Sequence, residues 1–248
     1  MSTKTKYTFQ EDDICLVAYP KSGNNFLLFL VAMLLYQTKM DWSTKGKMVQ
    51  NVSSEPIENL PSPHLVWSHN SYDPNYPKVI YLVRDPRDIV ISYYHHFQRY
   101  HGKMRNFDKF FHAFMGGSIG PGMWDRNIAS WLDNREKIKN GFLLIKYEDL
   151  LENTAKEAHR IANFLNVDRT EKEINEAVDW ASFDNMKALE KKQNTHVSGN
   201  SPLADPNIAF VREGQANKWK SVLSQEQQQQ INQKFHKTLT RLGYDIST

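Results

Sequence analysis

The sequence predicts an α/β fold in which a central, mostly parallel sheet is flanked by helices. Three apolar runs rich in β-branched and aromatic residues are typical of buried strands, at residues 14–19, 79–83 and 142–147. Each run is followed by a segment that is expected to be helical, at residues 24–37, 86–101 and 152–165. Strands that alternate with helices form crossover units, and such units pair their strands in parallel.

Length and composition narrow the class of protein. The 248 residues favour one domain over 1–248, because α/β domains reach about 250 residues. With 31 Lys and Arg against 28 Asp and Glu, the formal charge of +3 is too small for a protein that coats nucleic acid. The single Cys15 and the lack of a signal-peptide pattern predict a cytoplasmic protein. The longest apolar run, 26–35, is shorter than the ~20 residues that cross a bilayer, so no membrane partner is expected.

Three further segments complete the chain. Residues 44–77 are rich in Ser, Asn and Pro, and we expect a short helix with loops there. Residues 191–209 are polar and contain Gly and Pro, which indicates either a functional lid or a disordered insertion. Residues 224–242 are expected to be helical, with the glutamine run on a solvated face.

The motif YPKSGNNF at 19–26 lies between the first strand and the first helix. The unpaired backbone N–H groups of a helix start form an anion site. Lys21 adds a positive charge to it, and Gly23 lets the backbone approach a phosphate closely. An ordinary N-capped helix would carry similar residues. The spacing of a Walker A loop is absent.

The motif at 79–94, VIYLVRDPRDIVISYY, places Arg84 at the carboxyl end of a buried strand, where α/β sheets bind ligands. The Asp-Pro pair at 85–86 is a good helix start, which puts Ser92 about two turns into the helix. Arg84 and Ser92 could then hold one phosphate together. Alternatively, Arg84 pairs with Asp88. A third motif, REGQANKWK at 212–220, follows the long polar segment and could clamp a phosphate.

In this order, the three motifs resemble those of the sulfotransferases that use 3′-phosphoadenosine 5′-phosphosulfate (PAPS), particularly the cytosolic, small-molecule type. Tyr147-Glu148-Asp149-Leu150 and Trp124 also match. The resemblance implies a three-layer, P-loop-like fold. It also implies transfer of a sulfuryl group from PAPS to a hydroxyl or amine of a small-molecule acceptor, with PAP as the product and no metal.

The resemblance assigns a role to each residue of the site. The residues implied to hold the nucleotide are Lys21, Ser22, Gly23, Asn24, Asn25, Phe26, Arg84, Ser92, Tyr147, Phe183, Arg212, Glu213 and Gly214. Lys21 and its loop would bind the 5′-phosphosulfate, and Lys21 would also be catalytic. Arg84, Ser92 and Arg212 would bind the 3′-phosphate, while Phe26 and Phe183 would enclose the adenine.

The resemblance makes His69 the general base, because it follows a short strand just before the 3′-phosphate motif. The sequence departs from its relatives at Trp67, where many of them carry a lysine that stabilises the transferring group. We expect aromatic residues of the middle segment, such as Tyr72, Tyr100 or Trp124, to line the acceptor pocket.

Two other functions are consistent with parts of the pattern. A Mg²⁺-dependent, kinase-like phosphotransferase would need a Walker A loop. A catalytically inactive protein that binds PAP or PAPS would fit the departure at Trp67. The acceptor, the choice between O- and N-sulfation, and the oligomeric state are left open by the sequence.

Overall fold

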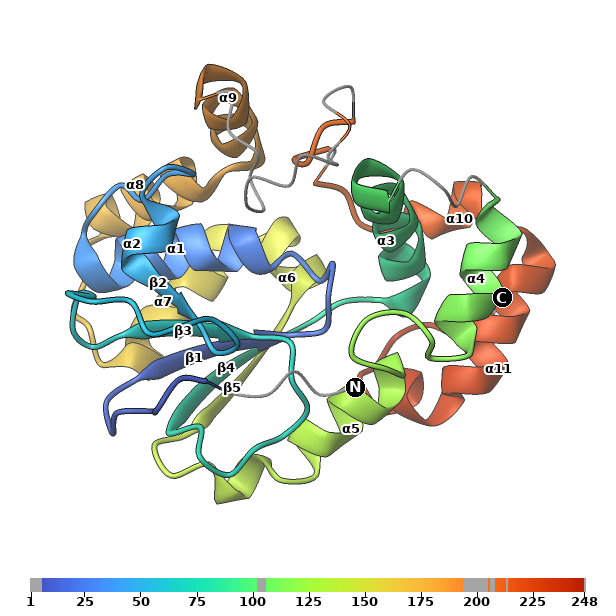
Figure 1. The fold of residues 1–248 in the computed structure, drawn as a ribbon, viewed down its shortest axis with the longest axis horizontal. Coiled ribbons are helices and arrows are strands. Elements are labelled where there is room, and N and C mark those ends of the chain that lie inside the picture. The colour runs from blue at the N-terminus through green and yellow to red at the C-terminus, as the bar shows by residue number, and fades with distance from the viewer. Residues whose placement is uncertain (1–5, 102–105, 194–204, 206–207, 213, 248) are drawn as a thin grey trace.

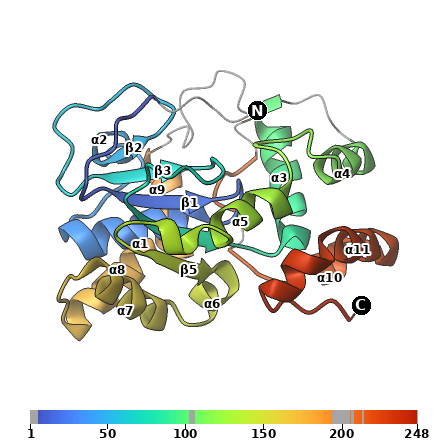
Figure 2. The ribbon, with the colours of Figure 1, turned by 90° about the horizontal axis from the view of Figure 1, so that it is seen from below.

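The computed structural model describes residues 6–101, 106–193, 205, 208–212 and 214–247. Its centre is a five-stranded sheet in the order β2-β3-β1-β4-β5, and each neighbouring pair is parallel. The strands are β1 (Ile14–Ala18), β2 (Val49–Asn51), β3 (Leu65–Ser68), β4 (Lys78–Val83) and β5 (Phe142–Lys146). Helices cover both faces, so the predicted three-layer α/β fold is confirmed (Figures 1 and 2).

One face of the sheet packs against helices from the first and third crossover units. These are α1 (Asn24–Tyr36), α6 (Tyr147–Glu152), α7 (Thr154–Leu165) and α8 (Glu171–Ala181), with α9 (Phe183–Gln193) following. Leu16, Leu82 and Ile145 point into this layer. The α1 residues from Leu27 to Leu34 are all buried, which explains why that helix is apolar on every side. Within the described ranges, no helix combines the length and apolarity needed to cross a bilayer.

The opposite face packs against a second set of helices. These are α3 (Pro86–His101), α4 (Phe107–Met115), α5 (Trp124–Leu132) and α11 (Gln225–Arg241), with the short η1 (Arg135–Lys137) and α10 (Trp219–Val222). Cys15, Val17 and Tyr81 point into this layer, alternating along their strands with residues of the first layer. Alternation between two apolar layers accounts for the continuously apolar strands in the sequence.

The predicted strands and the helices at 24–37, 86–101 and 224–242 are confirmed to within a residue or two at each end. The helix expected at 152–165 is α7, which begins two residues later than predicted, and a separate short helix that the sequence did not indicate, α6, precedes it. They are separated at Asn153, whose side chain accepts a hydrogen bond from the N–H of Lys156. Most of segment 191–209, the predicted lid or insertion, lies outside the described residues.

The segment at 44–77 contains more structure than the sequence indicated. It holds α2 (Lys45–Met48), β2 and β3. The strands are three and four residues long, too short to show a recognisable alternation. Their order places β3 beside β1, so the residues after β1, β3 and β4 meet at one edge of the sheet.

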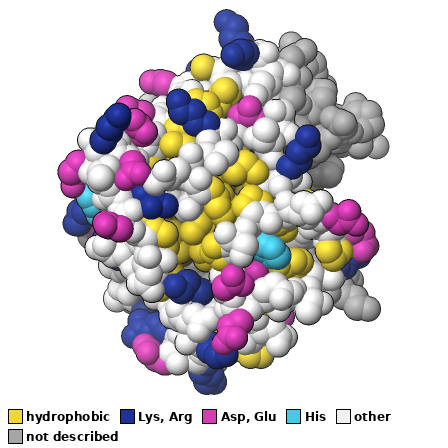
Figure 3. Space-filling model, turned by 90° about the vertical axis from the view of Figure 1, so that its left-hand side faces the viewer, with side chains coloured by type: hydrophobic (Ala, Val, Ile, Leu, Met, Phe, Trp, Pro, Cys, Tyr) yellow, Lys and Arg dark blue, Asp and Glu magenta, His cyan; other side chains and the backbone are white. Residues whose placement is uncertain are grey.

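Charges of both signs are intermixed over the face shown in Figure 3, where they surround an apolar surface. This agrees with the near balance of 31 basic and 28 acidic residues. The face offers no continuous cationic surface of the kind that tracks a nucleic-acid backbone.

Candidate active site

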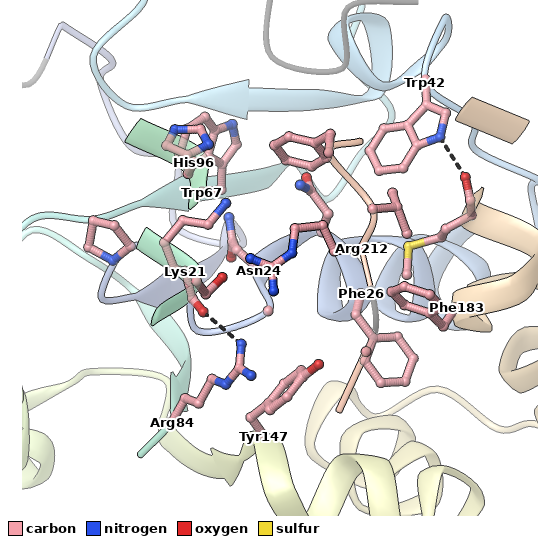
Figure 4. A pocket seen from close by; sticks show the side chains of 18 of the residues that line it. Lys21, Asn24, Phe26, Trp42, Trp67, Arg84, His96, Tyr147, Phe183 and Arg212 are labelled. Carbon is pink, nitrogen blue, oxygen red and sulfur yellow. Dashed lines mark hydrogen bonds between the residues drawn. The ribbon is translucent and has the colours of Figure 1, made fainter. Parts of the chain in front are cut away.

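A cavity of about 1190 Å³ opens at the carboxyl edge of the sheet. Its walls come from the β1–α1 loop, α2, the end of β3, α3, the start of α9 and the segment around Arg212. All three motifs singled out in the sequence therefore border one space. Figure 4 shows Lys21, Asn24, Arg84 and Arg212 directed toward it, with Phe26 and Phe183 to one side.

The β1–α1 loop has the geometry of an anion site. Lys21 and Gly23 have φ angles of 71° and 102°, and no side chain caps the helix that begins at Asn24. The buried Ser22 Oγ and Asn24 Oδ1 have no hydrogen-bond partner among the described residues. Unpaired polar groups in a buried helix start are costly unless a ligand satisfies them. The loop therefore fits the phosphate group that the sequence predicted here.

Gly23 is required by a close contact as well as by its backbone angle. A Cβ at this position would lie 2.5 Å from two ring carbons of Tyr147. The ring of Tyr147 also packs under Arg84, whose Cζ is 4.2 Å from the ring centroid. Tyr147 thus links the first motif to the second.

Several cations converge on the cavity. Burial and the charges of Arg212, Arg84 and Arg99 lower the pKa of Lys21 to about 7. Arg99 is 5% exposed and lines the cavity, although no motif in the sequence indicated it. So many desolvated positive charges in one space favour a ligand with several negative charges.

Arg84 is held by backbone oxygens. Its guanidinium donates to the oxygen of Lys21 at 3.2 Å and to that of Gln215 at 2.9 Å, while its buried Nε has no partner among the described residues. The alternative that Arg84 pairs with Asp88 is wrong. Asp88 instead accepts hydrogen bonds from the backbone N–H groups of Asn217 and Trp219, at 2.7 and 3.0 Å.

The hydrogen bonds to Asp88 attach the segment after Arg212 to the start of α3. Gly214 in that segment has a φ of 58°, and a Cβ there would lie 2.4 Å from the ring of Phe183. Arg212, Gly214, Ser92 and Phe183 all line the cavity. Glu213, which the resemblance also placed here, lies outside the described residues.

His69 lies directly after β3 and lines the same cavity. Its Nδ1 is 2.6 Å from the backbone oxygen of Ala18 at the end of β1. A carbonyl can only accept, so Nδ1 carries the proton and Nε2 of the neutral ring has a free lone pair. Burial, together with the charges of Lys21 and Lys45, lowers the pKa of His69 to about 4 and keeps the ring neutral.

Lys45 on α2 is a site residue that the sequence did not indicate. Its Nζ donates to Asn25 Oδ1 at 2.5 Å and lies 5.7 Å from the centroid of the Trp67 ring. Burial lowers its pKa to about 8. In this contact the side-chain oxygen of Asn25 accepts, and the Nδ2 group is the side-chain atom that could donate to a ligand.

The aromatic residues expected to line the acceptor pocket are elsewhere. Tyr72 and Trp124 pack against Trp131 and Phe235 in the core, and Tyr100 packs against His96. None of the three lines the cavity. The wall beside His69 is instead formed by residues of the segment at 44–77, namely Lys45, Val49, Asn51, Ser54, Ile57 and Trp67.

Comparison with known proteins finds one family over most of the chain. Residues 11–243 match the family described as "Sulfotransferase domain". An amine sulfotransferase of Oryctolagus cuniculus is 27% identical, with 94% of this chain and 82% of the relative covered. Sulfotransferase 1B1 of Canis lupus familiaris is 28% identical, with 92% and 84% covered.

Solved structures share the fold. Mouse sulfotransferase SULT7A1 complexed with PAP has a TM-score of 0.76 at 22% identity, covering 94% of this chain and 85% of its own. Retinol dehydratase in complex with androsterone and the inactive cofactor PAP has a TM-score of 0.78 at 19% identity, covering 93% and 81%. With a family match that spans residues 11–243 and a site assembled from the expected motifs, the chain belongs to the sulfotransferase domain family.

Proposed function

We propose that the chain, acting as one domain over 1–248, transfers the sulfuryl group of PAPS to a hydroxyl or amine of a small-molecule acceptor, with His69 as general base. As a sulfotransferase, it uses PAPS as the sulfuryl donor and releases PAP. The observation that carries the finer assignment is the hydrogen bond from His69 to Ala18. It leaves Nε2 without a proton, with its lone pair available, in the same cavity that contains Lys21.

The nucleotide end of the cavity suits a molecule with two separate phosphates. Lys21, Ser22 and the N–H groups at the start of α1 would bind the 5′-phosphosulfate, with Nδ2 of Asn25 as a further donor. Arg84, Ser92, Arg212 and the backbone of Gly214 would bind the 3′-phosphate. Arg84 Nε has no partner in the described part of the chain, which supports this role, because a buried guanidinium N–H gains most from a charged acceptor.

Aromatic rings are available for the adenine. Phe26 at the start of α1 and Phe183 at the start of α9 both border the nucleotide end (Figure 4). Offset stacking between two rings suits a purine. Tyr147 supports the same end through its contacts with Arg84 and the Gly23 loop.

The chemical step requires the chain to accept one proton and to stabilise the negative charge that develops on the leaving group. His69 Nε2 would accept the acceptor's proton as the acceptor oxygen or nitrogen forms its bond to sulfur. The bond from sulfur to the bridging oxygen breaks, and its electron pair remains on the 5′-phosphate of PAP. Lys21 and the loop N–H groups would stabilise that negative charge. The residues described thereby supply positioning and a positive field.

The acceptor belongs on the wall formed by α2, β2 and β3, next to His69. This wall combines apolar Val49 and Ile57 with polar Asn51 and Ser54. Such a lining suits a small amphipathic molecule that exposes a hydroxyl or an amine. The amine sulfotransferase among the relatives is consistent with that acceptor class.

A cytoplasmic location is part of the proposal. Cys15 is a free thiol at 0% exposure in the middle of β1. Burial raises its pKa, which keeps it protonated and unreactive. A single buried thiol suits a reducing compartment.

The proposal is tested by ligand-dependent melting followed by a turnover assay. In EDTA, PAP should raise the melting temperature, because ligands that bind the folded state stabilise it. Turnover should then be found with labelled PAPS and a panel of phenols, alcohols and amines. Stabilisation only by ATP with Mg²⁺ would favour the phosphotransferase. A PAP shift with no transfer to any acceptor would favour the inactive binding protein.

A further inference from the structure

Lys45 is a half-buried cation in the cavity, and the mechanism above assigns it no role. It has a side-chain amide as its hydrogen-bond acceptor, Asn25 Oδ1 at 2.5 Å, and an indole ring beneath its Nζ, that of Trp67 at 5.7 Å. Neither partner carries a negative charge. A desolvated ammonium held only by neutral groups can gain considerably from an anionic ligand.

Lys45 contacts residues next to both the proposed phosphosulfate-binding loop and the proposed general base, His69. Asn25 is in the first turn of α1, at the helix start that would bind the 5′-phosphosulfate, and Trp67 stands two residues before His69. The charge of Lys45 also acts on the imidazole, since it contributes with Lys21 to lowering the pKa of His69. Two lysines on different elements, the β1–α1 loop and α2, therefore act on one histidine.

In-line transfer determines where the sulfuryl group must lie. The attacking atom has to be within reach of His69 Nε2, and the leaving oxygen has to be beside Lys21 and its loop. The sulfuryl group is between these two positions. Lys45 lies next to the space between these two positions. Its Nζ donates to Asn25 at the start of α1 and lies over the ring of Trp67, two residues before His69.

We propose that Lys45 is a second catalytic lysine, whose Nζ leaves Asn25 Oδ1 to donate hydrogen bonds to the non-bridging oxygens of the sulfuryl group during transfer. The proposal rests on the function proposed above. Lys45 keeps its proton throughout. Lys21 stabilises the charge on the leaving oxygen, and Lys45 stabilises the charge spread over the group in transit, so the two residues have separate roles.

Trp67 supports this assignment through strand geometry. Residues 67 and 69 are two apart, and side chains with that spacing point to the same face of an extended chain. A lysine at position 67 would consequently reach the space that Lys45 Nζ occupies from α2. The indole found there instead forms a wall on which the ammonium of Lys45 rests.

The decisive variants are Lys45→Met and Lys45→Arg, with Lys47→Met as the matched control. Lys47 is on the same short helix but is exposed to solvent. We expect Lys45→Met to lower kcat by about 10²–10³-fold, the usual loss on removing a transition-state donor. The Kd for PAP should change by less than about threefold, because PAP lacks the sulfuryl group. Lys47→Met should resemble the unmodified protein.

The pH profile separates a catalytic role from a structural one. Since the pKa of Lys45 is about 8, kcat/KM should show an alkaline step near that pH. The step should be absent from Lys45→Arg, because a guanidinium does not lose its proton there. A step near the pKa of Lys21, about 7, should remain in both proteins. Lys45→Met should also raise the pKa of His69, because it removes a positive charge from its surroundings.

A rescue experiment completes the test. Adding Trp67→Lys to Lys45→Met should recover at least about tenfold of the lost kcat, because a new ammonium enters the same space. The inference is overturned if Lys45→Met keeps its kcat and pH profile, or if kcat and PAP binding fall together in both variants at position 45. Absence of turnover in the unmodified protein would instead refute the function on which the inference rests.

Discussion

His69 and Ala18 lie at the ends of adjacent strands, and the imidazole Nδ1 of the first donates to the backbone oxygen of the second at 2.6 Å. The contact fixes the ring by backbone atoms of the sheet itself. It also decides which nitrogen faces the cavity as a base. A histidine oriented in this way needs no carboxylate partner to set its tautomer.

We predict that His69→Ala lowers kcat by about 10²–10⁴-fold, the usual contribution of a general base, while the Kd for PAP stays unchanged. The exposed His112 on α4 provides the control, and His112→Ala should keep full activity. Steady-state kinetics and calorimetric titration with PAP measure the two quantities. Full activity of His69→Ala with a hydroxyl acceptor would remove His69 from the mechanism.

We predict that PAP raises the pKa of His69 above its value of about 4. The negative charges of the ligand offset the fields of Lys21 and Lys45, which favours the imidazolium. Histidine side-chain NMR titrations with and without PAP measure the shift. Adenosine, which lacks phosphates, should produce a smaller one. An unchanged or lowered pKa in the PAP complex would contradict the placement of the phosphates beside Lys21.

Arg84→Met should weaken PAP binding by roughly 10–100-fold, because a hydrogen bond to a charged group contributes about 1.5–3 kcal/mol. The loss should be specific to the 3′-phosphate. Affinity for AMP, which has only the 5′-phosphate, should change little. Arg126→Met, at an exposed position of α5, is the control for charge. Equal losses for PAP and AMP would show that Arg84 does not bind the 3′-phosphate.

Gly23→Ala should disrupt the β1–α1 loop. The added Cβ would lie 2.5 Å from the ring of Tyr147 at a φ of 102°, so both the backbone and the ring must move. We expect a lower melting temperature and at least about tenfold weaker PAP binding. Gly46→Ala is the matched control, since a Cβ there meets nothing within 4 Å. Similar behaviour of the two variants would refute the close contact with Tyr147.

The buried pair of Asp85 and Arg87 should be important for stability. The guanidinium lies 2.7 Å from the carboxylate and packs on Trp219, and both side chains are almost fully buried. Arg87→Met should lower the free energy of unfolding by about 3–5 kcal/mol, because it leaves a buried charge alone. The exposed pair of Arg135 and Glu136 should contribute at most ~1 kcal/mol. Urea denaturation of Arg87→Met and Arg135→Met compares them.

The parts of the site that are continuous in sequence could be predicted from it. The loop at 19–26 and Arg84 each follow a strand whose apolar run is long enough to recognise, so their place at the sheet edge follows from local pattern. Arg99 and Lys45 carried no such signal. They reach the cavity from the fourth turn of α3 and from a four-residue helix, and neither is adjacent in sequence to a motif.

The residues that form the acceptor wall could not be predicted from the sequence either. Tyr72 and Trp124 were reasonable candidates by residue type, but both are used to build the core. The wall comes instead from α2, β2 and the loop that follows, where strands of three and four residues are too short to show a period. Which aromatic ring faces a cavity depends on packing between distant segments.

The amino-acid sequence by itself determined the α/β class, the family, and the positions of the loop at 19–26 and of His69 just after strands of the sheet, because these depend on contiguous runs whose spacing sets local geometry. Only the tertiary structure decided that Asp88 holds the segment after Arg212, that Ala18 orients His69, and that Lys45 stands beside Trp67. These contacts join residues that are 129, 51 and 22 positions apart. Burial and electrostatic fields at such separations arise only when the sheet is assembled.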